Sequence, residues 1–283
     1  MIIWLASYPK SGNTWVRSII SSLLYSEDGN FNFNLIEKID QFPEKKYFKD
    51  LIKDFNDFHE IFRNWIIAQD KINLDGKIKI FKTHQGKYTI NNNNFTNSDN
   101  TLATIYIVRD PRSLIKSISN HYTLSMDEAF DFLINPRLMG DGKSFEEKKD
   151  GIYNILGRWD EHYRSWTDNK KNFLLIKYED LIKDAEIELK RIIRFLQNYL
   201  NFRVDNNKIR NILKSTSFEN LKKMESAGDF KEYENKAEYK KNGEKFNFFH
   251  LGPQNIWKEN LKHEIALKIE KNFYKTMKEL EYL

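Results

Sequence analysis

A lysine, a glycine and two hydroxyl side chains stand close together near the N-terminus, in the segment Tyr-Pro-Lys-Ser-Gly-Asn-Thr-Trp at residues 8–15. Lys10 supplies a full positive charge, and Gly12 lets the backbone approach a ligand closely. Ser11 and Thr14 add hydroxyl donors. The segment joins an apolar run to helix-periodic apolar residues, which predicts a strand, a tight loop and a helix. Such a junction aims backbone N–H groups and the positive end of a helix dipole at one point, so it favours an anion such as a nucleotide phosphate.

The signature of nucleoside-triphosphate loops, G-x-x-x-x-G-K-[ST], is absent because the lysine here precedes the only glycine. The order of residues instead resembles the 5′-phosphosulfate loop of the sulfotransferases that use 3′-phosphoadenosine 5′-phosphosulfate. An ordinary strand-to-helix turn with a solvated lysine is the alternative interpretation. The residues that the resemblance assigns to donor binding are Lys10, Ser11, Gly12, Asn13, Thr14 and Trp15. The resemblance also implies that Lys10 takes part in catalysis.

A second anion site is predicted where the run Thr-Ile-Tyr-Ile-Val at residues 104–108 meets Arg-Asp-Pro-Arg. Arg109 stands at the carboxyl end of a predicted parallel strand, where open α/β sheets bind ligands. Ser117 lies on the following helix and can share that pocket, and a guanidinium with a hydroxyl suits a terminal phosphate. Read alone, Arg-Asp-Pro-Arg is also typical of a capped helix start. The segment at residues 106–117 resembles the family's 3′-phosphate motif, which implies that Arg109 and Ser117 bind the 3′-phosphate of the donor.

A histidine follows the second predicted strand, in Ile-Phe-Lys-Thr-His at residues 80–84. Because imidazole titrates near neutral pH, His84 suits the role of a general base. A hydrogen-bonded structural histidine is the alternative. The segment resembles the Lys-Thr-His element of the cytosolic sulfotransferases, which implies that His84 is the catalytic base.

Three further segments are similar to nucleotide-binding elements of the same family. Tyr178 begins a segment that resembles the family's Tyr-Glu-Asp element, whose tyrosine contacts the adenine region. Ser217 and Phe218 match an element whose aromatic residue faces the adenine opposite the loop tryptophan, here Trp15. Core packing is the alternative for these aromatic residues. The last segment matches less well, because His-Leu replaces Arg-Lys before a glycine. The resemblance implies that His250 and Gly252 face the 3′-phosphate with less positive charge than relatives provide.

The elements that must position these residues follow from the apolar pattern, which predicts an α/β fold, a single domain over residues 1–283, with a central parallel sheet flanked by helices. The resemblance implies a P-loop-NTPase-like sulfotransferase fold. The predicted strands are residues 2–6, 78–81, 104–108 and 173–178. The predicted helices are residues 14–25, 58–69, 111–122, 152–166, 181–200, 206–213 and 257–280. Residues 91–100 are predicted to form a loop, residues 31–57 receive no assignment, and residues 227–247 form either a flexible loop or a lid over the site.

Composition narrows the class of protein. The 283 residues include 46 basic and 41 acidic residues, a formal net charge of +5, in mixed rather than blocked order. No cysteine is present, which excludes disulfides and cysteine-ligated metals. Neither a membrane span nor a secretory signal is predicted, so we expect a cytoplasmic protein.

The resemblance implies a sulfotransferase that moves a sulfuryl group from 3′-phosphoadenosine 5′-phosphosulfate to an acceptor hydroxyl or amine. We expect neither a metal nor a nucleic-acid partner. A magnesium-dependent small-molecule kinase on the same fold is one alternative, because a fold does not fix its chemistry. A non-catalytic nucleotide- or RNA-binding protein is another. The acceptor, whether carbohydrate, lipid, small alcohol or phenol, and the oligomeric state are not encoded in any pattern of the sequence.

Overall fold

The fold is described from a computed structural model, which places residues 1–139, 152–167, 171–230 and 247–283. Most of the loop or lid predicted at residues 227–247 lies outside the described residues. We therefore describe the architecture from the remaining chain.

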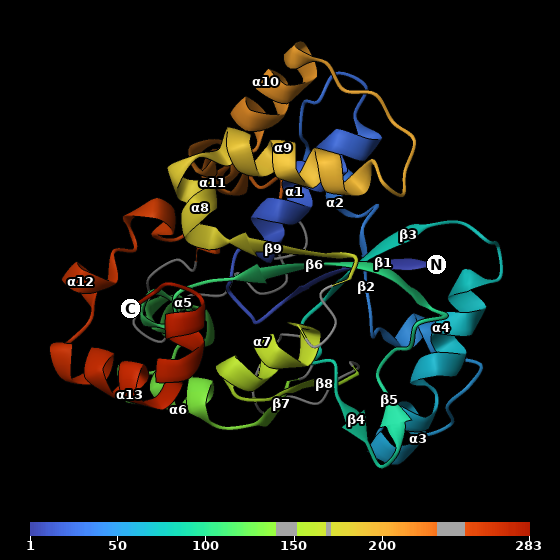
Figure 1. Ribbon diagram of the computed structural model, residues 1–283, viewed down its shortest axis with the longest axis horizontal. Helices are drawn as coiled ribbons and strands as arrows, with labels where there is room; N and C mark the ends of the chain where they lie inside the picture. Colours follow the sequence, from blue (N-terminus) through green and yellow to red (C-terminus); the bar gives the residue numbers. More distant parts are fainter. Residues whose placement is uncertain (140–151, 168–170, 231–246) are drawn as a thin grey trace.

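A parallel sheet of five strands forms the centre of the molecule (Figure 1), in the order β2-β3-β1-β6-β9. Its strands are β1 (Ile2–Ser7), β2 (Asp40–Gln41), β3 (Lys79–Thr83), β6 (Thr101–Val108) and β9 (Phe173–Lys177). The four predicted strands and the parallel sheet are confirmed. The edge strand β2 was not predicted, because two residues are too short to carry an alternating pattern and β2 exists by pairing with β3.

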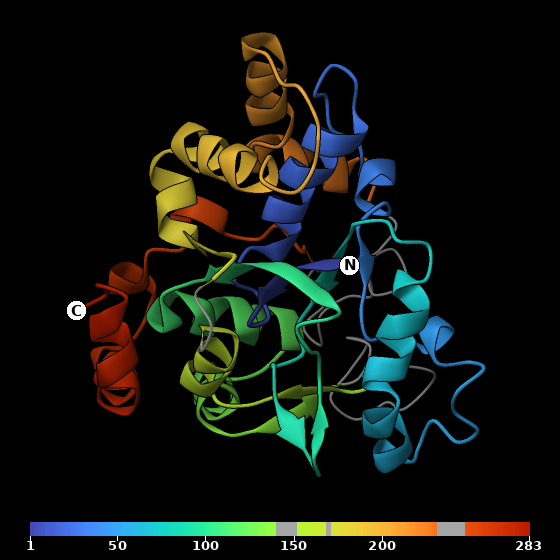
Figure 2. The same cartoon turned by 45° about the vertical axis from the view of Figure 1, so that its right-hand side comes forward.

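Alternate side chains of β1 face two separate cores. Ile3 and Leu5 pack into a core with α1 (Asn13–Tyr25), α9 (Ala185–Leu196) and α10 (Asn206–Ser215). Trp4 packs into the core on the other side, where both Figure 1 and Figure 2 show a second layer of helices. The helices contributing to that second core include α3 (Phe58–Arg63), α4 (Trp65–Asn73), α5 (Pro111–Tyr122), α6 (Met126–Ile134), α7 (Trp159–Thr167) and α13 (His263–Glu279). β1 is therefore buried on both faces, as its continuous apolar run indicates.

Helix α5 occupies the predicted residues. Asp110 is its N-cap and accepts a hydrogen bond from the Arg112 N–H, and Pro111 takes the first helical position. Three longer predicted helices are each divided in the structure. The dividing points are Asn64 between α3 and α4, Asp184 between α8 (Tyr178–Lys183) and α9, and residues 261–262 between α12 (Trp257–Asn260) and α13.

The helix predicted at residues 152–166 is wrong in its first half. Residues Asn154–Leu156 form strand β8, which pairs with β7 (Arg137–Met139), and the helix begins only at Trp159. The Ile155 N–H donates to the Gln85 side chain, and its carbonyl accepts from the Gly86 N–H. These hydrogen bonds to a distant segment hold residues 154–156 in a strand, although the local pattern of apolar residues favours a helix. In a second small antiparallel pair, β5 (Asn93–Asn94) lies within the predicted loop and β4 (Thr89–Ile90) lies directly before it.

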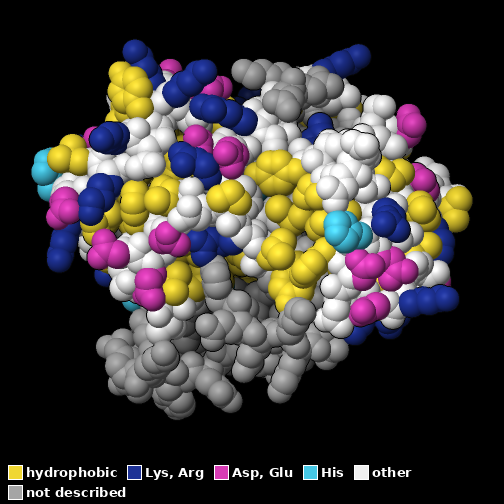
Figure 3. All heavy atoms as spheres, turned by 90° about the horizontal axis from the view of Figure 1, so that it is seen from below, with side chains coloured by type: hydrophobic (Ala, Val, Ile, Leu, Met, Phe, Trp, Pro, Cys, Tyr) yellow, Lys and Arg dark blue, Asp and Glu magenta, His cyan; other side chains and the backbone are white. Residues whose placement is uncertain are grey.

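Figure 3 shows the molecule from below relative to Figure 1, and this face carries both hydrophobic and charged side chains. In its described part, hydrophobic side chains gather near the middle, and lysine and arginine side chains are interspersed with acidic ones around them (Figure 3).

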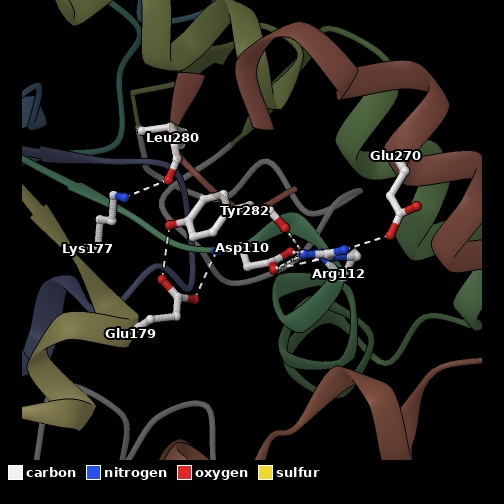
Figure 4. A network of polar contacts seen from close by, with 7 residues as sticks. All are labelled: Asp110, Arg112, Lys177, Glu179, Glu270, Leu280 and Tyr282. Carbon is white, nitrogen blue, oxygen red and sulfur yellow. Dashed lines mark hydrogen bonds and ion pairs between the residues drawn. The ribbon is translucent and has the colours of Figure 1, made fainter. Parts of the chain in front are cut away.

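A buried polar network fixes the C-terminal segment to the start of α5 (Figure 4). Arg112 pairs with Asp110 at 2.7 Å and with Glu270 at 2.6 Å, and donates to the Tyr282 carbonyl at 2.6 Å. The Glu179 carboxylate accepts from the Asp110 N–H at 3.0 Å and from the Tyr282 hydroxyl at 2.9 Å. The turn that follows β6 is therefore held from two sides.

Replacing Arg112 with alanine is expected to lower the free energy of unfolding by about 3–5 kcal/mol, because the Asp110 carboxylate would stay buried without a counter-charge. Urea denaturation measures this loss. Lys190→Ala, which removes an exposed pair with Glu186, is the matched control and should cost less than about 1 kcal/mol. Equal small losses in both variants would contradict the role of the network.

Candidate active site

A cavity of about 490 Å³ opens at the carboxyl ends of the sheet strands. All but two of the predicted site residues line it. These are Lys10, Gly12, Asn13, Thr14, Trp15, His84, Arg109, Ser117, Tyr178, Phe218, His250 and Gly252. The exceptions are Ser11, which is fully buried, and Ser217, whose hydroxyl caps helix α11 (Phe218–Ser226) by accepting from the Asn220 N–H. The structure thus brings together residues from nearly the whole chain, while their functional roles stay predictions.

The loop after β1 has the backbone of an anion-binding turn. Lys10 and Gly12 both have positive φ angles, 66° and 103°, and Gly12 is the N-cap of α1 with no side-chain cap. A Cβ atom on Gly12 would lie 2.6 Å from Cδ2 of Tyr178, so only glycine fits here. Asn13 secures the loop by donating to the Leu5 carbonyl and the Ser7 hydroxyl. The first N–H groups of α1 therefore remain available to a ligand.

The Lys10 ammonium group lies between two side chains that the sequence analysis did not select. Its Nζ is 3.6 Å from the centre of the Phe248 ring and 3.5 Å from Nδ1 of His121. Both residues line the cavity. Because His121 is on α5 and Phe248 follows the last undescribed segment, no sequence spacing relates either one to Lys10.

Arg109 is the strongest indication of an anion in this cavity. Its side chain lies over the Tyr178 ring at 4.1 Å, and Nη1 donates to the Lys10 carbonyl at 3.2 Å and to the Ser117 Oγ at 3.1 Å. The residue is 5% exposed, its buried Nε has no partner, and no carboxylate pairs with it in the described chain. A buried guanidinium that makes no ion pair with a carboxylate in the described chain suits the binding of an anion.

The Ser117 hydroxyl can donate a hydrogen bond to a ligand in the cavity beside Arg109. Its oxygen accepts from Arg109 and, at 3.2 Å, from the side-chain amide of Asn255. With both acceptor positions used, the hydroxyl proton remains for a ligand. Arg109 and Ser117 therefore share one pocket, as the sequence spacing predicted.

His84 is held as a neutral imidazole with one defined tautomer. Its Nδ1 is 2.8 Å from the Ser7 carbonyl, and since a carbonyl only accepts, Nδ1 carries the proton and Nε2 keeps its lone pair. Burial, followed by the charge of Lys82, lowers the pKa of His84 to about 3. The ring lines the cavity and can accept a proton at Nε2.

A second, fully buried histidine anchors the backbone of His84 from α7. His162 Nε2 donates to the His84 carbonyl at 3.1 Å, so its Nδ1 accepts from the Tyr106 hydroxyl at 2.8 Å. Burial lowers the pKa of His162 to about 4. On the same helix, Trp166 donates to the Gln85 carbonyl at 3.0 Å. The sequence analysis missed His162, although its place in an apolar stripe with Trp159 and Trp166 was a visible signal.

Aromatic side chains enclose the part of the cavity beyond Gly12. Trp15 and Tyr178 meet edge to face at 5.8 Å, and Phe218 meets Phe249 at 6.0 Å. Gly252 has a positive φ of 53°, and a Cβ there would lie 2.3 Å from the Phe218 ring. The Gly252 backbone thus lies against an aromatic face, an arrangement that suits a flat base between rings.

Fold and cavity together are typical of a nucleotide-binding α/β protein, with candidate anion-binding elements after β1 and after β6. Residues 2–281 match the family model described as the sulfotransferase domain, and the chain belongs to this family of enzymes. No helix in the described residues has the length and apolar character needed to cross a membrane.

Individual relatives are distant but cover most of the chain. Luciferin sulfotransferase from Photinus pyralis is 27% identical over 279 residues, covering 95% of this chain and 69% of that protein. Amine sulfotransferase from Oryctolagus cuniculus is 24% identical over 282 residues, covering 98% and 81%. Among solved structures, retinol dehydratase in complex with retinol and PAP has a TM-score of 0.60 at 18% identity, covering 98% of this chain and 81% of that chain. This last similarity concerns the fold.

The two buried histidines predict an acid-sensitive stability. Because their pKa values are lower in the folded protein than the usual value near 6.5, the unfolded chain binds more protons, and stability falls as the pH drops from 6.5 toward 4. His162→Gln should reduce the slope between pH 6 and 5 by up to about 1.4 kcal/mol per pH unit, measured by urea denaturation. The exposed His263→Gln is the control, and an unchanged slope in His162→Gln would contradict this assignment.

Proposed function

We propose that this protein transfers a sulfuryl group from 3′-phosphoadenosine 5′-phosphosulfate to a hydroxyl or amine of a small-molecule acceptor, as a single sulfotransferase domain. The observation that carries the proposal is the bond from Arg109 to the Lys10 carbonyl, which ties the two anion-binding elements together in one cavity. A ligand with phosphates at both ends of one nucleoside matches this pair of elements.

The residues present fit such a donor. The α1 N-terminus with Thr14 would hold the 5′-phosphate, and Arg109 with Ser117 would hold the 3′-phosphate. Trp15 and Phe218 would enclose the adenine. The buried, unpartnered Nε of Arg109 and the two glycines that contact aromatic rings are the structural features that support this fit.

The donor supplies an activated sulfuryl group, and the chain supplies charge and a base. His84 Nε2 takes the proton of the acceptor hydroxyl as the new S–O bond forms. Lys10 neutralises the negative charge that grows on the phosphate oxygen as the old S–O bond breaks. Holding the donor at both ends fixes the direction of attack.

The acceptor would enter at the ends of β2 and β3, on the opposite side of β1 from Arg109. Gln41, Pro43, Ile152 and Asn154 line this part of the cavity together with His84. The relatives and fold neighbours are named for, or bound to, luciferin, amines, retinol and androsterone. We infer an acceptor of similar small size for this chain.

Calorimetry with 3′,5′-adenosine bisphosphate and with 5′-AMP tests the donor assignment. The protein should bind the bisphosphate more tightly, and Arg109→Ala should weaken that binding by about 1.5–3 kcal/mol, or roughly 10- to 100-fold, as expected for a lost charge-assisted hydrogen bond. Binding of 5′-AMP should change much less. Equal affinity of the unaltered protein for the two nucleotides would refute the assignment.

His84→Asn should lower the rate of sulfuryl transfer by roughly 10²- to 10⁴-fold while bisphosphate affinity is retained. The assay incubates protein and donor with a cell extract of the source organism and detects the sulfated product by mass. Loss of bisphosphate binding in His84→Asn would make His84 structural.

EDTA should leave the rate of sulfuryl transfer unchanged, because Lys10 and backbone dipoles meet the negative charge of the donor. A rate that needs added Mg²⁺ would favour a kinase.

A further inference from the structure

The 3′-phosphate pocket contains less positive charge than its ligand requires. A phosphate monoester carries about −1.5 to −2 charges at neutral pH. Arg109 supplies one positive charge, and Ser117 supplies a neutral hydroxyl. This inference rests on the proposed function, and it asks which other side chain balances the second negative charge.

Most lysines of the cavity lie at its other end. Lys82 is on β3, and Lys45 and Lys46 follow β2, so the strand order places all three across β1 from Arg109. Lys46 is already paired with Asp40 and with Glu44. Lys10 belongs to the loop after β1. Lys45, Lys46 and Lys82 are therefore not on the Arg109 side of the sheet. The Lys10 ammonium group contacts Phe248 and His121, and the proposed function assigns its charge to the other end of the donor.

Lys116 is the lysine on the correct side. It precedes Ser117 on α5, which begins directly after the Arg109-Asp110 turn. Lys116 and Ser117 line the cavity together with the residues four positions later, Asn120 and His121, so one continuous face of α5 forms this wall. Leu251 and His250 line the cavity as well. Leucine carries no charge, and an imidazole is in general a much weaker base than a lysine amine.

The Lys116 side chain is half-buried, and its ammonium group has no hydrogen bond or ion pair in the described chain. A cation that lines a cavity next to a buried guanidinium with no ion pair raises the positive potential there. That arrangement is unfavourable in the empty protein and favourable once a doubly charged anion is bound. The flexible stem of a lysine allows its charge to reach such an anion.

We propose that Lys116 binds the 3′-phosphate of the donor together with Arg109 and Ser117, and that it determines the specificity for nucleotides that carry this phosphate. Lys116 acts there as a point charge, while Arg109 supplies the fixed planar donors. The assignment gives α5 two ligand-binding residues in sequence, Lys116 and Ser117.

Lys116→Met removes the charge and keeps the length of the side chain, so it is the decisive variant. Calorimetry at low salt should show that 3′,5′-adenosine bisphosphate binds about tenfold more weakly, while 5′-AMP binds as before. Lys116→Arg should retain most of the affinity. Lys271→Met, which removes an exposed lysine on α13 and changes the net charge equally, is the matched control.

The outcomes separate the two proposals. If the unaltered protein does not prefer the bisphosphate over 5′-AMP, the proposed function fails, and this inference fails with it. If the unaltered protein shows the preference and Lys116→Met retains it in full, only the inference on Lys116 is overturned. Equal weakening of both nucleotides also overturns it, as does equal weakening by Lys271→Met. Thermal unfolding of each variant confirms that the compared proteins are folded.

Discussion

The arrangement of the site depends on the hydrogen bonds that the buried guanidinium group of Arg109 donates. It joins the carbonyl of Lys10 in the loop after β1 to the hydroxyl of Ser117 on the helix after β6. Arg109 makes no ion pair with a carboxylate in the described chain, so the surrounding structure must hold its charge in place, in an arrangement that suits an anionic ligand. The network of Asp110, Arg112 and Glu179 provides that support from the C-terminal segment.

Opposite requirements meet at His84 and at Arg109. The proposed base must be a neutral imidazole, and burial together with the bond to the Ser7 carbonyl keeps His84 uncharged. The phosphate pocket needs positive charge, and the strand order separates the two places by β1. Loops that follow separate strands of one sheet therefore place an uncharged imidazole and a buried guanidinium in a single cavity.

Much of the fold was predictable because the strands are buried on both faces and therefore read as continuous apolar runs. Helix α5 was predicted to its end residues, since Asp110 and Pro111 are strong start signals. The helix predicted at residues 152–166 was wrong in its first half because Ile155 is hydrogen-bonded to Gln85 and Gly86, which are far away in the sequence. Local propensity contains no information on such a partner.

The sequence alone determined the loop after β1, the Arg109 and Ser117 pair, and the position of His84 after a strand, because each depends on spacing within one short segment. Only the tertiary structure showed that His162 anchors His84, that Lys10 lies between His121 and Phe248, and that Lys116 lines the same cavity. The physical reason is that these contacts join segments with no fixed spacing, and their geometry follows from strand order and helix packing rather than from neighbouring residues.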